Sequence, residues 1–462
     1  MRFYDRQNEL RTLERMYRLS KNAKHMLVVL GRRRIGKTRL IKEFIRGKKS
    51  FYFFVERSSS AMLLQRISNE LARMMPKKVV GTLDWELAFK ILLEDFDVVV
   101  LDEFQNILSV DESALSTLQH VWDEFNGSTL LILVGSYQTM MKKIFEDYRT
   151  PLYGRSSGRL RVEPLSYRYV RRILLDMKFR GEENMMNIYS ILGGVPLYYE
   201  FIERFGISGT WKDIVKAMFI EEPRPLIDEP HVLLVGEFGR QQSTYMSILE
   251  AIARGKSTMT EIANATGIPE KSLGKYLKEL SQDYEIIERK VPMFSPPNSK
   301  RGRYFLRDPF LTFWFRFIYP NMSMIELGQG DELIRSIENN VNAHMGRIFE
   351  KIVAEIIAEQ FKPLKMGSWW NRRGDEIDIV AELENEVLFV ECKWRNRKIT
   401  WREVEDLIRK SELVKIEASK KRRYMIVSKS GFTENCRNRI DEKGIIYWDL
   451  SDLERAMKVP NE

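Results

Sequence analysis

The residues best suited to chemistry near the start of the chain form one short run. The pattern Gly31-x-x-x-x-Gly36-Lys37-Thr38 matches the phosphate-binding loop template at each defined position. Glycine lets backbone N–H groups approach a phosphate closely, lysine supplies positive charge, and the threonine hydroxyl can ligate Mg²⁺. We therefore expect a site for ATP and Mg²⁺ formed by Gly31, Arg32, Arg33, Arg34, Ile35, Gly36, Lys37, Thr38 and Arg39.

A strand and a helix must position this loop. Residues 27–30 form an apolar run before it, and apolar residues recur at helical spacing through residues 40–45 after it. A loop between a buried strand and a helix N-terminus also gains positive potential from the helix dipole. The context predicts an α/β domain with parallel strands. A preceding amphipathic helix near residues 10–17 is expected either to contact the nucleotide or to pack in the core.

Two carboxylates follow another apolar strand, at residues 96–101. Asp102 is expected to hold Mg²⁺ through water or through the Thr38 hydroxyl, and Glu103 to polarise the attacking water. Ser136 ends a further apolar run at residues 130–135. Its hydroxyl is either a sensor of the γ-phosphate or part of a plain turn.

A glycine-rich basic segment follows at residues 151–160. Its Arg155 and Arg159 are either arginine fingers, acting in a neighbouring subunit or in cis, or solvated loop side chains. A finger acting in a neighbouring subunit would predict a homo-oligomeric ring. A sensor acting in cis would permit a monomer or a dimer.

The segment Gly-Gly-Val-Pro-Leu at residues 193–197 breaks one helix and starts another, with Pro196 suited to a first helical turn. Together with the phosphate loop and the strand ending Leu-Asp-Glu-Phe-Gln at residues 101–105, it resembles the archaeal ATPase family, within the STAND/AAA+-related P-loop NTPases. The resemblance implies a helical lid beside the nucleotide, with Pro196 near the adenine.

Residues 243–308 have the pattern of a helix-turn-helix followed by a basic hairpin. The expected recognition helix at 269–280 and the basic turn near 296–303 present polar residues for DNA phosphates, namely Lys271, Ser272, Lys275, Lys278, Lys300, Arg301 and Arg303. This pattern predicts a winged helix that contacts either DNA or another protein. The aromatic run at 308–317 is expected to be an apolar helix packed against another domain, with base stacking as the alternative.

Acidic residues and a lysine are grouped again towards the end of the chain. A helix is expected to open at Gly346 with Glu350 in its first turns, followed by strands at residues 374–381 and 387–394. Strand alternation places Glu391 and Lys393 on one face, and Asp378 on the neighbouring strand can converge with them. Such a group can hold Mg²⁺ or Mn²⁺, activate water and stabilise a pentavalent phosphate. A salt-bridged hairpin is the alternative.

This constellation resembles the PD-(D/E)xK nuclease superfamily, in the C-terminal form often joined to archaeal ATPases. The resemblance implies that Asp378 and Glu391 are metal ligands and that Glu350 is an assisting ligand. It also implies that Lys393 orients the nucleophile or stabilises charge. The usual Pro-Asp is replaced by Ile377-Asp378.

Length and composition restrict the class of protein, its partners and the number of its domains. The 462 residues carry a net charge of +10, which favours a polyanionic partner. Two cysteines exclude a disulfide framework or a Cys-rich zinc site and favour a reducing cytoplasm, and the apolar runs are too short to span a membrane. The expected fold is multidomain: a P-loop ATPase core at 1–165, a helical lid at 166–240, a winged helix-turn-helix at 241–320 and a restriction-endonuclease-like α/β domain at 321–462.

The first functional hypothesis is a cytoplasmic ATPase that binds DNA and cleaves it with a metal-dependent site. A nucleotide-controlled switch or scaffold with a non-cleaving nuclease-like domain is the second hypothesis. A transcription regulator gated by ATP is the third. DNA is the expected partner in the first, and a homo-oligomer is compatible with each.

Overall fold

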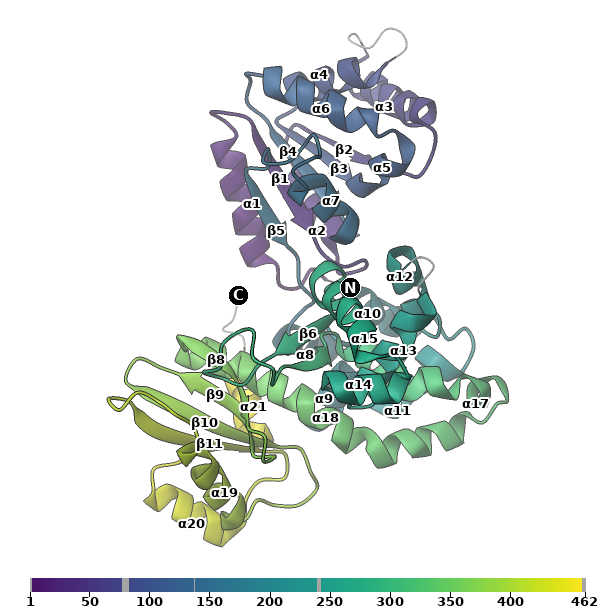
Figure 1. Ribbon diagram of the computed structural model, residues 1–462. Helices are drawn as coiled ribbons and strands as arrows, with labels where there is room; N and C mark the ends of the chain where they lie inside the picture. Colours follow the sequence, from purple (N-terminus) through teal and green to yellow (C-terminus); the bar gives the residue numbers. More distant parts are fainter. Residues whose placement is uncertain (1, 77–82, 137, 239–241, 459–462) are drawn as a thin grey trace. The chain divides into compact units, whose positions relative to one another are not determined.

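The computed structural model describes residues 2–76, 83–136, 138–238 and 242–458 (Figure 1). The chain divides into two compact units. We call residues 2–164 with 195–197 the N-terminal unit, and residues 165–194 with those from 198 onward the C-terminal unit. The C-terminal unit thus combines the segments expected to be lid, winged helix and nuclease-like domain. Within the described ranges, no helix is both long and apolar enough to cross a bilayer.

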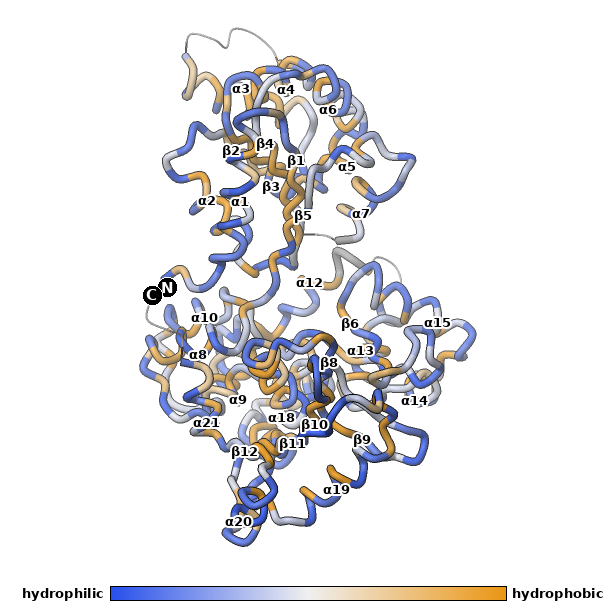
Figure 2. The backbone as a smooth tube through the Cα atoms, turned by 90° about the vertical axis from the view of Figure 1, so that its left-hand side faces the viewer, coloured by the Kyte–Doolittle hydropathy of each residue, from blue (hydrophilic) through white to orange (hydrophobic). Residues whose placement is uncertain are grey.

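A five-stranded parallel sheet in the order β2-β3-β4-β1-β5 forms the centre of the N-terminal unit. Its strands are β1 (His25–Leu30), β2 (Ser50–Phe54), β3 (Val98–Asp102), β4 (Leu130–Gly135) and β5 (Gly158–Arg161). β3 and β4 are buried along their whole length, as expected for parallel strands covered on both faces. Figure 2 shows these strands as largely hydrophobic segments.

Helices connect the strands of this sheet. They are α1 (Gln7–Leu19), α2 (Lys37–Ile45), α3 (Ser60–Met74), α4 (Trp85–Asp95), α5 (Ile107–Val110), α6 (Ser113–Glu124) and α7 (Gln138–Glu146). Ser59 and Asp84 cap α3 and α4 by accepting hydrogen bonds from first-turn N–H groups. Parallel connections bring the carboxyl ends of β1, β3 and β4 to one edge, where ligands of such sheets bind.

The first part of the C-terminal unit is helical and ends in a hairpin. Its helices are α8 (Tyr167–Asp176), α9 (Glu182–Leu192), α10 (Pro196–Arg204, whose first two residues are grouped with the N-terminal unit), α11 (Trp211–Val215), α12 (Glu229–Phe238), α13 (Gln242–Ala253), α14 (Met259–Thr266) and α15 (Glu270–Lys278). β6 (Ile287–Lys290) and β7 (Arg303–Leu306) then form a two-stranded antiparallel sheet. A capping box between Thr258 and Glu261 begins α14, and Gly267 ends it in the left-handed region.

The aromatic run after the hairpin folds into α16 (Pro309–Phe313) and a π-helical turn, η5 (Trp314–Ile318). Trp314 and Phe315 are fully buried, and the indole N–H of Trp314 donates to the carbonyl of Ile227 at 2.8 Å. The packing expectation is therefore confirmed for this segment. The base-stacking alternative is wrong, because these rings have no face open to a base.

A mixed five-stranded sheet in the order β12-β11-β10-β9-β8 forms the second part of the unit. Its strands are β8 (Lys365–Trp370), β9 (Glu376–Glu382), β10 (Glu386–Lys393), β11 (Lys421–Ser428) and β12 (Ile446–Trp448). The helices of this part are α17 (Met322–Glu326), α18 (Gly330–Phe361), α19 (Trp401–Glu412), α20 (Glu434–Glu442) and α21 (Leu450–Ala456), and α17 packs on α18 rather than on the sheet.

The helix expected to open at Gly346 in fact begins at Gly330, and α18 has 32 residues. Gly346 is an interior position of this helix, because buried residues at helical spacing continue through it and pack on α9, β9 and β10. Glu350 is therefore held in the middle of a long, anchored helix rather than near its frayed end.

Candidate nucleotide and metal sites

The phosphate loop connects β1 to α2, as its pattern predicted. A Cβ on Gly31 would lie 2.5 Å from the carbonyl oxygen of Val162, so a side chain there would displace the backbone. Gly36 has a φ of 91° at the start of α2, a conformation that favours glycine. Between them, Ile35 is fully buried and Arg34 is left-handed, with a φ of 69°. The loop is thus fixed by packing and by glycine.

Lys37 is the charged centre of the loop. Its Nζ donates to the carbonyl oxygens of Gly31 at 2.7 Å and Arg32 at 2.9 Å. Burial lowers the pKa of Lys37 to about 8, and the nearby positive charge of Arg33 acts in the same direction. A phosphate anion in the loop would oppose both effects. Arg39 packs its guanidinium 5.7 Å from the ring of Phe3.

Asp102 joins the loop to the end of β3. Its Oδ2 accepts a hydrogen bond from the Thr38 hydroxyl at 2.7 Å and another from the Tyr52 hydroxyl at 2.7 Å. The Asp102 side chain is buried, and its Oδ1 accepts from the backbone N–H of Glu103 at 2.9 Å. A hydroxyl and a carboxylate oxygen in contact are a donor set that fits Mg²⁺. Tyr52 could not be identified from the sequence, because no spacing rule links it to the loop.

Glu103 has a φ of 53°, an uncommon conformation for a residue with a side chain. Its carboxylate accepts a hydrogen bond from the Ser136 hydroxyl at 2.5 Å and another from the Gln105 side-chain amide. The backbone N–H of Ser136 donates to the Gln105 Oε1 at 3.3 Å. The structure thus brings Glu103 and Ser136 together, and adds Gln105, which the sequence analysis did not select.

Arg155 and Arg159 are not at the loop. Arg155 forms a two-pronged ion pair with Asp123, with contacts of 2.9 and 2.7 Å, and Arg159 pairs with Glu146. A role of either arginine in a neighbouring subunit stays a prediction. Residues 195–197, including Pro196 at the start of α10, are grouped with the N-terminal unit, and the position of Pro196 relative to a nucleotide stays a prediction.

Arg6 is a further residue that supports the loop. It is 4% exposed, donates to the carbonyl of Ile35 at 3.1 Å and pairs with Glu9 at 2.8 Å. An arginine bound to the carbonyl of a loop residue restricts the loop backbone. Its position in the polar start of the chain gave no signal that would have distinguished it from a surface arginine.

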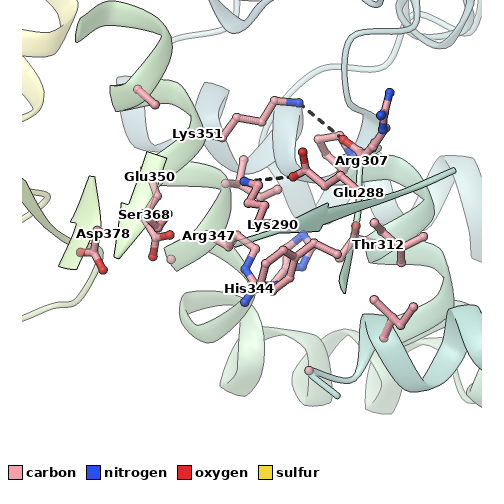
Figure 3. Close-up of a pocket in the computed structure, with 18 of the residues that line it drawn as sticks. Glu288, Lys290, Arg307, Thr312, His344, Arg347, Glu350, Lys351, Ser368 and Asp378 are labelled. Atoms are coloured by element: carbon pink, nitrogen blue, oxygen red, sulfur yellow. Dashed lines mark hydrogen bonds and ion pairs between the residues drawn. The ribbon is translucent and has the colours of Figure 1, made fainter. Parts of the chain in front are cut away.

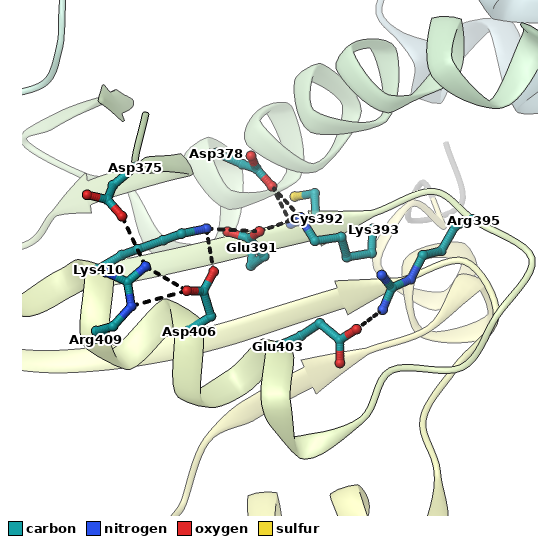
Figure 4. Close-up of polar contacts among 10 residues, drawn as sticks. All are labelled: Asp375, Asp378, Glu391, Cys392, Lys393, Arg395, Glu403, Asp406, Arg409 and Lys410. Atoms are coloured by element: carbon teal, nitrogen blue, oxygen red, sulfur yellow. Dashed lines mark hydrogen bonds and ion pairs between the residues drawn. The ribbon is translucent and has the colours of Figure 1, made fainter. Parts of the chain in front are cut away.

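The second constellation lies on neighbouring strands of the mixed sheet. Lys393 forms an ion pair with Glu391, and its Nζ lies 4.0 Å from the Asp378 Oδ2 (Figure 4). Asp378 also accepts a hydrogen bond from the backbone N–H of Cys392 at 2.8 Å. The predicted convergence of Asp378, Glu391 and Lys393 is present in this geometry.

Burial dominates the electrostatics of this group. It raises the pKa of Asp378 well above its ordinary value, and the charge of Glu391 adds to the shift. Burial also raises the pKa of Glu350 to about 7. Although burial alone would lower it, the pKa of Lys393 is raised by Glu391 and Asp378. Burial therefore makes Asp378 and Glu350 easier to protonate, whereas the nearby carboxylates keep Lys393 protonated.

Lys410 on α19 is a residue that the sequence analysis missed. Its Nζ lies 2.7 Å from Asp406 and 3.9 Å from Glu391, and its side chain is mostly buried (Figure 4). The other carboxylate oxygen of Glu391, Oε2, is buried and has no hydrogen-bond partner among the described residues. Nothing in the sequence around Lys410 distinguishes it from a surface lysine of an amphipathic helix.

The fit of a divalent metal to this group is partial. Asp378, Glu391 and Glu350 supply the oxygen ligands that Mg²⁺ and Mn²⁺ prefer, and the Glu391 Oε2 is available for one. However, no three His, Cys, Asp or Glu side chains in the described parts of the chain are arranged to share one ion. The expected three-carboxylate shell is thus not formed here, because the Lys393 ammonium pairs with Glu391.

The residues expected to contact DNA fall into two groups. Lys271, Ser272, Lys275 and Lys278 are exposed on α15, and Lys300 is exposed in the hairpin connection. Arg303 instead pairs with Glu376 at 2.9 Å, and Arg301 donates to the Ser295 hydroxyl at 2.8 Å. These two arginines hold the hairpin and its connection in place, so the structure favours the first group for phosphate contact.

Comparison with known proteins places both constellations in recognised sequence families. A family model described as an ATPase domain predominantly from Archaea matches residues 3–201. A second model, described as Archaea bacterial proteins of unknown function, matches residues 314–406, which include Glu350, Asp378, Glu391 and Lys393.

One relative extends over nearly the whole chain. An uncharacterized protein of Methanocaldococcus jannaschii is 34% identical over 442 residues, covering 92% of this chain and 95% of the relative. An uncharacterized ATP-binding protein of the same organism is 45% identical over 47 residues, or 10% of this chain and 76% of that protein.

A solved structure with a similar fold is the Walker-type ATPase of Pyrococcus abyssi. The TM-score is 0.51 at 20% identity, over 68% of this chain and 96% of that one. At this level of identity the likeness shows the fold.

Proposed function

Because the chain belongs to a family of ATPases found predominantly in Archaea, we propose that it couples ATP binding and hydrolysis to the binding and metal-dependent cleavage of DNA. The ATPase domain family supports nucleotide binding and hydrolysis in the N-terminal unit. The DNA-directed part rests on the residues of the C-terminal unit and on their resemblance to winged-helix and PD-(D/E)xK domains.

One observation carries the ATPase part, namely the 2.7 Å hydrogen bond between the Thr38 hydroxyl and Asp102. It connects the phosphate loop to the acidic end of β3. Bound Mg²⁺ would be held by these two residues and would neutralise the β- and γ-phosphates. Lys37 would turn from the loop carbonyls towards the same phosphates.

Glu103 is the proposed general base. As a water oxygen bonds to the γ-phosphorus, Glu103 accepts its proton, and the bond from that phosphorus to the β–γ bridging oxygen breaks to leave ADP and phosphate. The Ser136 hydroxyl and the Gln105 amide fix the Glu103 carboxylate before the reaction. Arg155 or Arg159 of a neighbouring subunit, in a homo-oligomer, would complete the charge stabilisation, and Pro196 would lie beside the adenine.

In the C-terminal unit, we propose that exposed α15 residues hold DNA by its phosphates. Asp378 and Glu391 would hold the divalent metal, with Glu350 assisting. Lys393 would orient the attacking water or stabilise the charge on the phosphate. The cytoplasm remains the proposed location.

The ion pair between Lys393 and Glu391 favours a second candidate function. If this lysine is permanently engaged, the domain is a nuclease-like scaffold controlled by nucleotide and cuts nothing.

The deciding test of the cleavage part is an assay with plasmid, single-stranded and branched DNA in Mg²⁺ or Mn²⁺. Wild type is expected to cut at least one of them, and Asp378→Ala is expected to cut none. Equal cutting by both proteins would point to another site or a contaminant. No cutting by wild type in either metal would favour the scaffold.

A further inference from the structure

A cavity of about 640 Å³ lies within the C-terminal unit. Its walls come from the β6–β7 hairpin, η5, α18 and strands β8 and β9, and both Glu350 and Asp378 line it. Figure 3 shows the labelled side chains running from Asp378 through Glu350 and Arg347 to Arg307. Two of the three carboxylates of the proposed metal site, Glu350 and Asp378, thus share one cavity with basic side chains.

Most of the basic residues in this cavity have protein partners. Lys290 pairs with Glu288 at 3.0 Å, Arg307 lies 3.7 Å from Glu285, and Lys351 donates to a carbonyl oxygen at 3.5 Å. The positive charges and N–H donors of these side chains therefore already have partners in the protein.

Arg316 and Arg347 differ from the other basic residues. Neither forms an ion pair or a hydrogen bond with any residue that the structure describes, although both line the cavity. The guanidinium of Arg347 lies 3.8 Å from the ring centroid of Phe305, and that of Arg316 lies 5.3 Å from that of Phe317. Arg316 is half-buried and Arg347 is exposed, and the surrounding protein lowers the pKa of both arginines, with the charge of Arg347 lowering that of Arg316 further. Two cations that line one cavity and have no hydrogen-bonding partner among the described residues favour an anion as its ligand.

The size of the cavity limits the ligand. Small-ligand sites commonly enclose about 300–1,000 Å³, which accommodates unstacked nucleotides but not a stacked double helix. Arginine binds phosphate oxygens through paired N–H donors, and single-stranded nucleic acids follow positively charged grooves.

We propose that this cavity binds an unpaired nucleic-acid strand, with Arg316 and Arg347 contacting its phosphates and directing one phosphodiester towards Glu350 and Asp378. The destination of that phosphodiester rests on the proposed nuclease function. The binding itself requires no cleavage. Duplex DNA would be held by the exposed residues of α15 instead.

The test measures binding of the full chain to a fluorescein-labelled 12-nucleotide oligo-dT by anisotropy, in EDTA so that no metal-dependent cutting occurs. Arg347→Ala and Arg316→Ala are each expected to weaken binding about 10-fold or more, and to reduce the slope of log affinity against log salt by about 1. Arg335→Ala removes an exposed arginine from the same helix and is expected to change affinity less than about 2-fold.

Further variants separate a binding role from a folding defect. Arg347→Lys keeps the positive charge and is expected to recover part of the lost affinity. Affinity for a 12-base-pair duplex should change less than about 2-fold in Arg347→Ala and should fall in Lys278→Ala.

Three results would overturn the proposal. The first is wild-type affinity for oligo-dT in both arginine variants. The second is an equal loss of affinity for the single strand and for the duplex in Arg347→Ala. The third is complete displacement of the oligonucleotide by micromolar thymidine monophosphate. The last would mean a site for a free nucleotide. Asp378→Asn separates the two proposals, because it should abolish cleavage while binding the strand at least as tightly as wild type. Loss of the nuclease hypothesis alone would therefore leave this binding result intact.

Discussion

Replacement of Glu103 by glutamine isolates the proposed chemical step of the ATPase. The side chain keeps its shape, and it can still accept from Ser136 or Gln105, so only one of its two acceptor oxygens becomes a donor group. The Ser136 hydroxyl can rotate to accept from the new amide, so a hydrogen bond to an ionised carboxylate, worth about 1.5–3 kcal/mol, is replaced by a neutral one of about 1 kcal/mol. Loss of a general base slows a reaction by about 10²- to 10⁴-fold, or about 2.7–5.4 kcal/mol in the barrier. Turnover should therefore fall far more than folding stability.

The assay compares phosphate release at saturating ATP and Mg²⁺ with the binding of a fluorescent ATP analogue. Glu103→Gln should bind the analogue within about 3-fold of wild type and lose at least 99% of turnover, as the lower bound of general-base catalysis requires. Glu112→Gln, which changes an exposed carboxylate after the same strand, should leave both unchanged. Hydrolysis by Glu103→Gln within 2-fold of wild type would refute the assignment of the base.

Three further predictions address packing, protonation and the second site. Gly31→Ala should lower the free energy of unfolding by about 1–3 kcal/mol and weaken ATP binding, because its Cβ would lie 2.5 Å from a backbone oxygen. The control Gly158→Ala should change neither, because a Cβ there meets only ordinary contacts. Equal melting temperatures of the two variants would contradict this prediction. Burial lowers the pKa of His344 to about 4 from 6.5, so the unfolded state binds more protons than the folded state between these pH values. Acidification from pH 7 to 5 should therefore lower the free energy of unfolding by about 2 kcal/mol in the wild type but not in His344→Gln. Parallel pH profiles of the two proteins in chemical denaturation would contradict this prediction. Lys410→Met should slow DNA cleavage by about 10- to 100-fold without weakening DNA binding, since its ammonium lies 3.9 Å from Glu391, and unchanged cleavage would assign Lys410 to structure alone.

The sequence was most informative where chemistry requires a fixed local spacing. The loop from Gly31 to Thr38, the acidic end of β3 and the alternation of Glu391 and Lys393 each follow a short pattern that local geometry enforces. The structure placed each of them as the pattern predicted. In each case the partners in the chain are adjacent or nearly so.

Contacts between distant segments could not be predicted in this way. Tyr52 reaches Asp102 across neighbouring strands, Arg6 reaches Ile35 from another element, and Lys410 approaches Glu391 from a helix. No single-sequence rule specifies which of many polar side chains meets a distant carboxylate.

The boundaries of helices were also difficult to predict from the sequence. The helix expected to start at Gly346 runs from Gly330, because glycine in a helix interior costs only about 1 kcal/mol and the apolar face continues on both sides of it. The aromatic run, in contrast, is packed as its apolar pattern predicted, and its rings are buried too tightly to meet a base.

Helices α8 and α9 are joined to α21 by ion pairs of one buried arginine. Arg171 on α8 pairs with Glu182 on α9 at 2.8 Å and with Glu454 on α21 at 2.9 Å. A buried arginine held by two carboxylates resists separation of these elements. The C-terminal unit is therefore expected to behave as one body rather than as separate domains.

We propose that nucleotide in the N-terminal unit controls how the C-terminal unit binds and cleaves DNA. The most direct measurement is the affinity for oligo-dT and its rate of cleavage in Mg²⁺, with ATP, with ADP and without nucleotide, in wild type and in Lys37→Ala. Allosteric coupling of ordinary size predicts an ATP-dependent change of about 5- to 150-fold in wild-type affinity, and none in Lys37→Ala. Identical affinities and rates in all three nucleotide states of the wild-type protein would contradict the account.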